Sequence, residues 1–353
     1  MSQPDRIFIK GNEAIARGAL AAGAKCFFGY PITPQNDIPE FMSQAMVDAG
    51  GQFVQAESEV AAANMLFGAA ACGIRALTSS SSPGISLKQE AISYMAGSEV
   101  PAVIVNVSRG GPGLGDIGPS QADYFQSVKG GGHGDYKLLV LAPGTVQEAY
   151  DLTIKAFDLA FKYRNPVMIL ADAIIGQMKE PVVPWVPENR DPNEGGTWGL
   201  VGAKNRAPRL IKSLFLEDGA LAGQNLKLQA KYKRMQAEVD QELFLTDDAE
   251  LIVVAFGSIG RIVKSTVRKL RAQGKKVGLV RPITLFPFPS DVLLGLAKQG
   301  KRFITIEHNM GQMVEDVRLA IRTVADSDFY AQLPGTLPTP DDFEEPILKA
   351  LEG

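Results

Sequence analysis

Residues 52–110 carry the pattern that decides the fold: QFVQAESEVAAANMLFGAAACGIRALTSSSSPGISLKQEAISYMAGSEVPAVIVNVSRG. In it, short apolar or β-branched runs alternate with longer stretches rich in alanine and glycine. The short runs predict strands at 52–55, 76–79 and 102–107, and the longer stretches predict helices at 59–71 and 84–95. Strand, helix and strand in this order predict an α/β domain with a mostly parallel sheet.

The same alternation continues on both sides of this stretch. Further strands are predicted at 6–10, 26–30, 138–141 and 167–170, and further helices at 12–22, 35–48 and 146–162. Several of these strands are continuous apolar runs, which is typical of strands buried on both faces of a parallel sheet. We therefore expect residues 1–178 to form a first α/β domain.

The composition changes after this domain. Residues 179–249 begin with a proline-rich run, continue with a polar Gly/Asn-rich segment at 189–205 and include a charged stretch at 220–243, for which we predict a helix. We interpret 179–249 as a linker or arm between domains. The charged helix could dock another subunit or lie solvated on the domain surface, and both readings remain open.

The α/β pattern returns from residue 250 onward. Its predicted strands are 251–256, 276–280 and 303–307, and its predicted helices are 261–273, 290–298 and 312–324. We therefore expect 250–353 to form a second domain. The expected fold class is α/β, with two doubly wound, mostly parallel-sheet domains.

The composition argues against several classes of protein. The 353 residues include 36 basic and 39 acidic ones, so the net charge of −3 favours neither a nucleic-acid partner nor a membrane surface. The two cysteines, Cys26 and Cys72, are too few to ligate an iron–sulfur cluster, and we expect both to be buried thiols. We recognise neither a signal peptide nor an apolar run long enough to span a bilayer, and we expect a cytoplasmic protein.

Polar residues follow several predicted strands, at the edge where open α/β sheets bind ligands. Thr33 lies between two prolines in Gly-Tyr-Pro-Ile-Thr-Pro (29–34), where it could cap the next helix or bind a ligand. Glu57 and Glu59 follow the next strand and precede or begin an Ala-rich helix. A glutamate there could complement the helix dipole, or it could be a carboxylate in dry surroundings, suited to proton exchange with a ligand.

Two more segments follow the fourth and fifth strands of this domain. Thr-Ser-Ser-Ser-Ser-Pro-Gly (78–84) offers hydroxyls and free amides at a helix N-terminus, but it lacks the lysine of a P-loop and could be an ordinary polar loop. Arg109 lies beside glycines in 108–115. Its planar guanidinium could bind a carboxylate or could form a structural salt bridge.

The histidines and the second domain give weaker signals. His133 lies in a glycine-rich loop and His308 follows a predicted strand, and for each a functional and a hydrogen-bonded structural role remain open. Histidines so far apart do not form a metal-ligand cluster, so we predict no metal site in this chain. The Gly-Ser-Ile-Gly run (257–260) lacks the third glycine of a dinucleotide site, which makes a stand-alone NAD-dependent enzyme a weak alternative.

Six of these motifs together resemble one family. They are Gly-Asn-Glu-Ala (11–14), Gly-Tyr-Pro-Ile-Thr-Pro (29–34), Gln-Ala-Glu-Ser-Glu (55–59), Thr-Ser-Ser-Ser-Ser-Pro-Gly (78–84), Arg-Gly-Gly-Pro-Gly (109–113) and Lys-Gly-Gly-Gly-His-Gly-Asp (129–135). The set is similar to the alpha-type subunits of 2-oxoacid:ferredoxin oxidoreductases, most closely the branched-chain (3-methyl-2-oxobutanoate) subgroup. The resemblance covers residues 8–178 strongly and 250–353 more loosely.

The resemblance implies a cofactor and the domains that bind it. Residues 1–178 resemble the pyrimidine-binding domain for thiamine diphosphate, and residues 250–353 resemble the C-terminal domain of transketolase. Glu59 is similar to the glutamate that hydrogen-bonds N1′ of the aminopyrimidine, which helps the cofactor to lose its C2 proton. We prefer Glu59 to Glu57 because Gly68 follows it nine residues later, as in the family.

The resemblance also implies further contacts. The other expected cofactor contacts are Pro31, Ile32, Ser81 and Ser82. Thr33 and Arg109 resemble the pair that holds the carboxylate of the substrate. The loops 29–34 and 109–118 offer Arg109 as their basic residue, which favours a monocarboxylate such as the branched-chain 2-oxoacid. The alternatives are 2-oxoglutarate, an aryl 2-oxoacid, or a non-catalytic scaffold subunit.

The resemblance implies partner chains as well. We find no Gly-Asp-Gly…Asn stretch of the kind that binds the cofactor diphosphate through Mg2+, so a beta-type subunit is expected to supply that site. Gamma-type and ferredoxin-like subunits are expected to contribute, with 4Fe-4S clusters carried by the partner chains. Coenzyme A is the expected acyl acceptor and ferredoxin the expected electron acceptor. The isolated chain is expected to bind thiamine diphosphate poorly.

Overall fold

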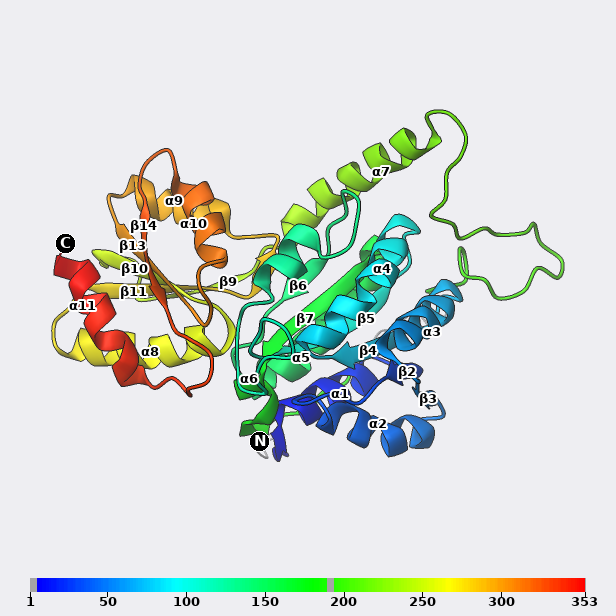
Figure 1. The fold of residues 1–353 in the computed structure, drawn as a ribbon, viewed down its shortest axis with the longest axis horizontal. Coiled ribbons are helices and arrows are strands. Elements are labelled where there is room, and N and C mark those ends of the chain that lie inside the picture. Colours follow the sequence, from blue (N-terminus) through cyan, green and yellow to red (C-terminus); the bar gives the residue numbers. More distant parts are fainter. Residues whose placement is uncertain (1–4, 189–193, 353) are drawn as a thin grey trace.

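The computed structural model describes residues 5–188 and 194–352 and shows two lobes, each built around one sheet (Figure 1). The larger sheet has seven strands in the order β12-β6-β7-β5-β4-β2-β3, and the smaller has five in the order β14-β13-β10-β11-β9. The part of the predicted 189–205 segment that falls on 189–193 lies outside the described residues, as do residues 1–4 and 353.

The larger sheet follows the predicted strands closely. Its strands are β2 (Cys26–Gly29), β3 (Gln52–Gln55), β4 (Ala76–Ser80), β5 (Ala102–Ser108), β6 (Leu139–Leu141), β7 (Pro166–Asp172) and β12 (Thr284–Phe286). All pairs are parallel except that of β12 with β6. Every residue of β4, β5 and β7 is buried, as expected for strands with helices on both faces.

Helices connect these strands. They are α1 (Gly11–Ala21), α2 (Asp37–Asp48), α3 (Glu59–Ala71), α4 (Ser82–Gly97), α5 (Val146–Tyr163) and the short α6 (Ala173–Gln177), with a π-turn at Gln126–Gly130. Helix α1 packs against α5 and α2, and α3 packs against α4. The mostly alanine and glycine surfaces of α1 and α3 permit this close packing.

The smaller sheet has the second predicted α/β pattern. Its strands are β9 (Gln241–Phe244), β10 (Leu251–Val254), β11 (Val277–Pro282), β13 (Arg302–Glu307) and β14 (Ser327–Ala331), and only β9 is antiparallel to its neighbour. Its helices are α8 (Gly257–Ala272), α9 (Ser290–Lys298), α10 (Met313–Ile321) and α11 (Glu344–Glu352), the last preceded by a 3-10 turn (Pro340–Phe343).

The structure corrects several expectations. The predicted helix 220–243 is wrong in its second half: α7 (Ala220–Met235) ends in a 3-10 turn (Gln236–Glu238), and β9 follows, because residues 241–244 pair with β11. Strands β12 and β14 were not predicted. Cys26 is buried as expected, but Cys72 is only partly buried because it caps the C-terminus of α3.

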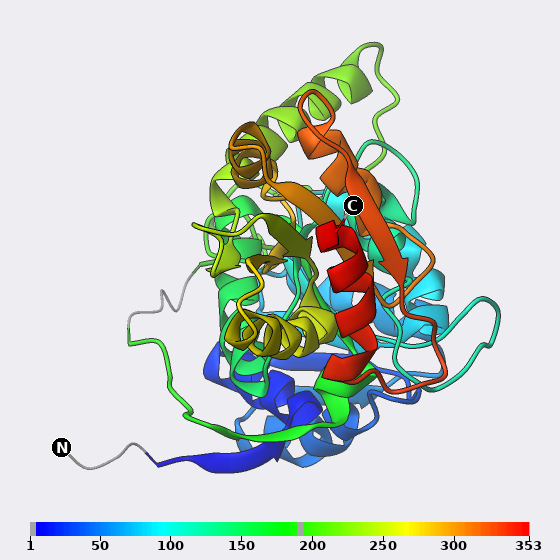
Figure 2. The same ribbon diagram turned by 90° about the vertical axis from the view of Figure 1, so that its left-hand side faces the viewer.

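The predicted first strand also lies elsewhere than expected. Strand β1 (Ile7–Lys10) pairs antiparallel with β8 (Lys179–Val182) in a separate two-stranded sheet, and Figure 2 shows these segments side by side. Because β8 lies in the stretch interpreted as a linker, the first residues of that stretch belong to the larger lobe. No described helix is both long and apolar enough to cross a membrane.

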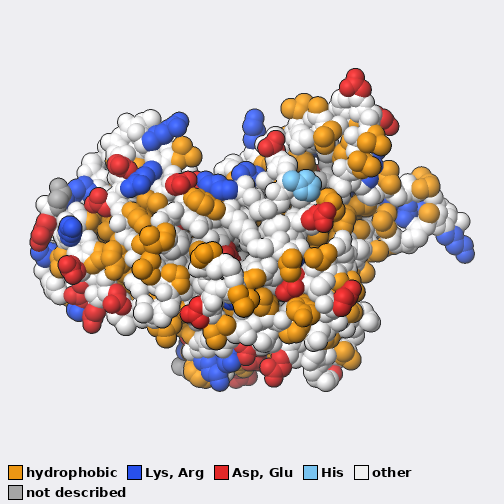
Figure 3. All heavy atoms as spheres, in the orientation of Figure 1, with side chains coloured by type: hydrophobic (Ala, Val, Ile, Leu, Met, Phe, Trp, Pro, Cys, Tyr) orange, Lys and Arg blue, Asp and Glu red, His pale blue; other side chains and the backbone are white. Residues whose placement is uncertain are grey.

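Helix α7 and the segment before it form a projecting arm (Figure 1). Residues 199–219 contain no described helix or strand, and Leu210, Leu214 and Leu216 are exposed there. Figure 3 shows hydrophobic side chains on the surface of this arm. Docking of another subunit on α7 remains a prediction.

The carboxyl ends of both sheets meet at the boundary between the lobes. Gln121 is buried in the loop that follows β5 and bonds to the ends of β10 and β13. Its side chain donates from Nε2 to the carbonyl of Phe256 (2.9 Å) and accepts from the amide of His308 (3.1 Å). Its backbone amide donates to the His308 carbonyl (2.9 Å), and its carbonyl accepts from Nδ2 of Asn309 (2.9 Å).

We predict that Gln121→Ala lowers the free energy of unfolding by about 2–3 kcal/mol, because it leaves the buried His308 amide and Phe256 carbonyl without these partners. Urea unfolding of the purified chain measures the change. Gln44→Ala is the matched control, since Gln44 lies exposed on α2 and bonds only to Asp48 on the same helix. Equal stability of the two variants would contradict the prediction.

Candidate functional site

The candidate residues come together at the carboxyl edge of the larger sheet. Nη1 of Arg109, after β5, donates to the carbonyl of Thr33, after β2 (2.9 Å). The backbone amide of Arg109 donates to Oγ of Ser82, at the start of α4 (3.0 Å). Two residues further along α4, Gly84 lies against the side chain of Glu59, the first residue of α3. Four segments that are distant in sequence therefore form one continuous surface.

Glu59 is buried, with 7 % of its surface exposed. It begins α3 directly after the N-cap Ser58, whose Oγ accepts from the amide of Ala61 (3.2 Å). A Cβ atom added at Gly84 would lie 2.7 Å from Oε1 of Glu59 and 2.1 Å from Oγ of Ser80, so only glycine permits this approach. Within the described part of the chain, no hydrogen bond reaches the Glu59 carboxylate, which leaves it available to a ligand.

Several buried polar atoms nearby have no hydrogen-bond partner among the described residues. They are Oγ of Ser80, Oγ of Ser81, Oδ1 of Asn106, Oγ of Ser108 and Nε of Arg109. Ser80 and Asn106 pair across β4 and β5, so these atoms lie near the ends of adjacent strands. Because buried polar groups are normally hydrogen-bonded, such a cluster fits a site that is completed by a ligand.

Ser82 has a different environment from Ser80 and Ser81. Its hydroxyl donates to Oδ2 of Asp123 (2.6 Å) and accepts from the Arg109 amide. Nδ2 of Asn106 donates to the same Asp123 oxygen (2.8 Å). Ser82 therefore fixes the Arg109 loop through its hydroxyl. Asp123 was not predicted, because it lies in a loop that is distant in sequence from Ser82.

The loop after β2 is held by the protein around it. Thr33 does not cap a helix, since α2 begins at Asp37 and Thr33 Oγ1 instead accepts from Nδ2 of Asn36 (3.4 Å). The buried Gln35 accepts from Oγ of Ser79 (2.5 Å), which attaches the loop to β4. Pro31 and Thr33 are exposed and Ile32 is partly buried. The capping alternative for Thr33 is therefore wrong, and its side chain lies at the surface of the site.

Arg109 is buried, with 6 % of its surface exposed. Its guanidinium donates to two carbonyls, those of Thr33 (2.9 Å) and Leu114 (3.1 Å). Among the described residues it forms no ion pair, so the structural salt-bridge alternative is not what the structure shows. Because no described carboxylate neutralises its positive charge, the guanidinium suits an anionic ligand.

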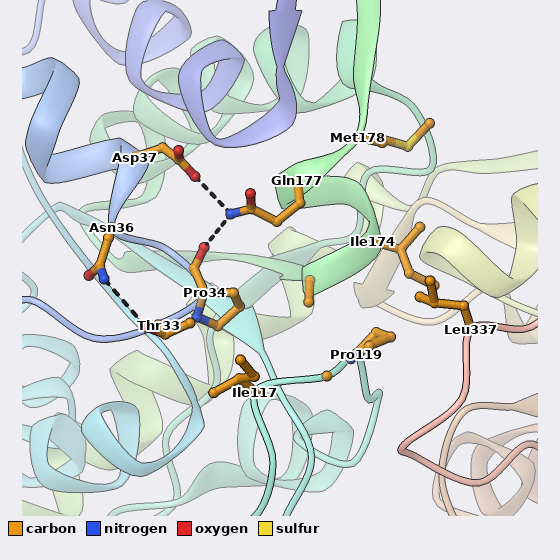
Figure 4. Close-up of a pocket in the computed structure, with 12 residues that line it drawn as sticks. Thr33, Pro34, Asn36, Asp37, Ile117, Pro119, Ile174, Gln177, Met178 and Leu337 are labelled. Atoms are coloured by element: carbon orange, nitrogen blue, oxygen red, sulfur yellow. Dashed lines mark hydrogen bonds between the residues drawn. The ribbon is translucent and has the colours of Figure 1, made fainter.

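A cavity of about 660 Å³ opens beside Thr33 (Figure 4). Its walls are Thr33, Pro34, Asn36, Asp37, Ile117, Gly118, Pro119, Ala173, Ile174, Gln177, Met178 and Leu337. On its polar side, Nε2 of Gln177 donates to the Pro34 carbonyl (2.8 Å) and to Asp37 (2.7 Å). The remaining wall is mostly aliphatic and includes Leu337 from the smaller lobe.

Lys88 was missed in the sequence, where it is an ordinary lysine in a helix. It is fully buried on α4, and its Nζ donates to Oγ1 of Thr78 (3.1 Å) and, more weakly, to the backbone carbonyl of Glu59 (3.4 Å). Burial lowers the pKa of its ammonium group to about 8, against the opposing effect of the Glu59 charge.

The two histidines lie apart from these residues. His133 is exposed and makes an edge-to-face contact with Tyr94 on α4, with ring centroids 5.8 Å apart. His308 is buried at the lobe boundary, and burial lowers its pKa. Among the described residues, no group of three or more His, Cys, Asp or Glu side chains has an arrangement that could hold a metal ion.

Comparison with known proteins identifies relatives along most of the chain. Residues 17–240 match the family described as pyruvate flavodoxin/ferredoxin oxidoreductase, thiamine diphosphate-binding, and residues 249–343 match pyruvate:ferredoxin oxidoreductase core domain II. The chain is 54 % identical over 314 residues to a ketoisovalerate oxidoreductase subunit VorB of Methanothermobacter thermautotrophicus, covering 88 % of this chain and 89 % of the relative. It is 34 % identical over 374 residues to a 2-oxoglutarate synthase subunit KorA of the same organism, covering 98 % and 99 %.

Solved structures share the fold. A 2-oxoglutarate:ferredoxin oxidoreductase from Magnetococcus marinus superposes with a TM-score of 0.88 at 24 % identity, covering 99 % of this chain and 66 % of that one. A split-gene transketolase superposes with a TM-score of 0.60 at 14 % identity, covering 98 % of both chains. These similarities confirm the predicted fold class.

Lys88 predicts a pH-dependent contribution to stability. Its pKa is about 8 in the folded chain and 10.5 as the ordinary value, so the unfolded chain binds more protons between these limits. The free energy of unfolding should therefore gain about 3 kcal/mol from Lys88 as the pH rises from 8 to 10.5. Urea unfolding of wild type and Lys88→Met across this range isolates the contribution, and parallel pH dependences would refute it.

Proposed function

The chain belongs to the pyruvate flavodoxin/ferredoxin oxidoreductase family, and from that premise we propose that it holds the pyrimidine end of thiamine diphosphate in a branched-chain 2-oxoacid:ferredoxin oxidoreductase. The observation that carries the proposal is the buried Glu59 carboxylate, which packs against Gly84 and has no protein donor among the described residues. The family reaction is the coenzyme A-dependent oxidative decarboxylation of a 2-oxoacid to acyl-CoA and CO2, with reduction of ferredoxin. Such subunits act together with partner chains.

The residues around Glu59 fit the pyrimidine ring. The Glu59 carboxylate can accept a hydrogen bond from a ring nitrogen and can hold a proton there. The unpartnered hydroxyls of Ser80 and Ser81 can bond to other polar atoms of the ring, while Pro31 and Ile32 supply apolar contacts. When bound, thiamine diphosphate supplies the electron sink for decarboxylation.

Arg109 and Thr33 are the proposed partners of the substrate carboxylate. The Arg109 guanidinium is buried and free of ion pairs in the described chain, and its Nε has no acceptor. A carboxylate can therefore bond to it without displacing a protein anion. The hydrogen bond from Arg109 to the backbone carbonyl of Thr33 keeps Thr33 beside this charge.

The cavity beside Thr33 supports a branched aliphatic substrate. Its described walls include Ile117, Ile174, Met178 and Leu337, and no lysine or arginine is among them. The distal carboxylate of 2-oxoglutarate would lie against these apolar walls and near Asp37, which is unfavourable without a counter-charge. The relatives that are 54 % and 53 % identical are named as ketoisovalerate oxidoreductase subunits, in agreement with this reading.

The remaining parts of the enzyme are proposed to lie on other chains. A beta-type subunit would hold the cofactor diphosphate and Mg2+, and gamma-type and ferredoxin-like subunits would complete the complex, with 4Fe-4S clusters in the partner chains. The support is the lack of a Gly-Asp-Gly…Asn stretch and the presence of only two cysteines in the sequence.

Glu59→Gln in the assembled complex should lower kcat/KM at least about 100-fold, because the amide cannot exchange a proton with the cofactor. Glu57→Gln is the matched control, since Glu57 is an exposed glutamate two positions away, and it should leave the rate near wild type. The measurement is 2-oxoacid- and coenzyme A-dependent reduction of ferredoxin. A fully active Glu59→Gln complex would indicate the non-catalytic scaffold subunit instead.

Ile117→Arg should change substrate preference, because it adds a positive charge to the wall of the apolar cavity. We expect the ratio of kcat/KM for 2-oxoglutarate to that for 3-methyl-2-oxobutanoate to rise about tenfold or more. Leu114→Arg is the matched control, since Leu114 is exposed on the same loop but does not line the cavity. The same ratio in both variants would argue against this cavity as the side-chain site.

A further inference from the structure

Lys88 is a buried cation with few hydrogen-bond acceptors and no ion pair among the described residues. The buried Lys231 has a carboxylate of Glu99 at 3.6 Å, and the buried Lys301 donates to three backbone carbonyls at 2.8–3.0 Å. Lys88 donates to one hydroxyl and, more weakly, to one carbonyl, and no described carboxylate lies within ion-pair distance of it. Because burial of an ammonium group is costly, this environment disfavours the charge.

The position of Lys88 on α4 relates it to Glu59. Gly84 and Lys88 are four residues apart, so they lie on the same face of the helix, one turn from each other. Gly84 lies against the Glu59 side chain, and Lys88 donates to the Glu59 backbone carbonyl. One face of α4 therefore contacts both the carboxylate and the backbone of the same residue.

The charge of Lys88 also acts on Glu59. The two residues attract each other electrostatically, and the Glu59 carboxylate favours the charged form of the lysine. The same attraction acts on the carboxylate, so Lys88 is a positive charge that influences where the Glu59 side chain lies. Through Thr78 on β4, Lys88 also joins the first turn of α3 to the sheet.

We propose that Lys88 is a positioning residue for Glu59, which fixes the first turn of α3 and supplies a positive charge that attracts the hydrogen-bond-accepting carboxylate. The proposal rests on the assignment of Glu59 as the residue that contacts the pyrimidine end of thiamine diphosphate. Removal of the ammonium group takes away its attraction for the Glu59 carboxylate and its hydrogen bond to the Glu59 backbone carbonyl. Burial of Lys88 therefore lowers the stability of the fold, and the role of this residue lies in its effect on Glu59.

The test uses the assembled complex with Lys88→Met, which keeps a long, unbranched apolar side chain. We expect kcat/KM to fall about 10- to 100-fold and to lose the pH dependence near 8 that titration of Lys88 gives the wild type. Affinity for thiamine diphosphate, measured by calorimetric titration of the apo complex, should fall as well. The melting temperature should stay the same or rise, because a poorly compensated buried charge is removed.

Lys231→Met is the matched control for a buried lysine. Burial lowers the pKa of Lys231 to about 8 as well, but Lys231 lies on α7 with Glu99 as its partner. Its replacement should lower the melting temperature, because Glu99 loses a partner, and should leave the pH profile and the cofactor affinity of the complex unchanged. The two variants therefore separate a structural role from a positioning role.

A double-variant cycle shows whether Lys88 acts through Glu59. In the Glu59→Gln background, Lys88→Met should cause no further loss of kcat/KM. An additive loss, a wild-type pH profile for Lys88→Met, or a lower melting temperature with unchanged cofactor affinity would each overturn the proposal. A wild-type rate for Glu59→Gln itself would instead remove the proposed function on which it rests.

Discussion

The arrangement of the whole chain depends on the contact between the carboxyl ends of its two sheets. Gln121 forms hydrogen bonds to the residues that follow β10 and β13, and Ser258 at the start of α8 donates to the buried Asp172 at the end of β7. These contacts hold the loop that follows β5 against the smaller lobe, and Leu337 of that lobe reaches the cavity beside Thr33. The cavity beside Thr33 therefore depends on how the two lobes dock.

Two buried cations near this edge differ from the buried arginines Arg75 and Arg281 elsewhere in the described chain. Arg281 is buried and paired with Glu148 and Glu242, and Arg75 is buried and paired with Glu194 and Asp158. Arg109 and Lys88 are also buried, yet neither has an ion pair among the described residues. An unpaired buried charge lowers the stability of the fold. Arg109 and Lys88 therefore destabilise the chain at the site, whereas the paired arginines do so less.

The sequence predicted the parts of the fold that local pattern determines. The segment 52–110 predicted β3, α3, β4, α4 and β5 nearly to the residue, because short apolar runs alternate there with longer Ala/Gly-rich stretches. Local pattern did not predict β9, β12 or β14. These strands lie at sheet edges and form by pairing with strands that are distant in sequence. Likewise, Thr33, Glu59 and Arg109 follow strands and were predictable, whereas the burial of Lys88 depends on how α4 packs against α3 and β4.

The exposed residues around the site connect the binding of a partner subunit with the strength of the charge interactions at the site. Thr33 and the aliphatic residues Leu114 and Ile117 are exposed in the isolated chain, while Glu59 and Lys88 are buried. A partner that covers this surface removes water, and removal of water lowers the local dielectric and strengthens each interaction between charges. The interaction between Lys88 and Glu59 is therefore weaker in the free chain than in a covered site. If a partner subunit covers this site, its charge interactions are strongest in the complex. This agrees with the expectation that the isolated chain binds thiamine diphosphate poorly.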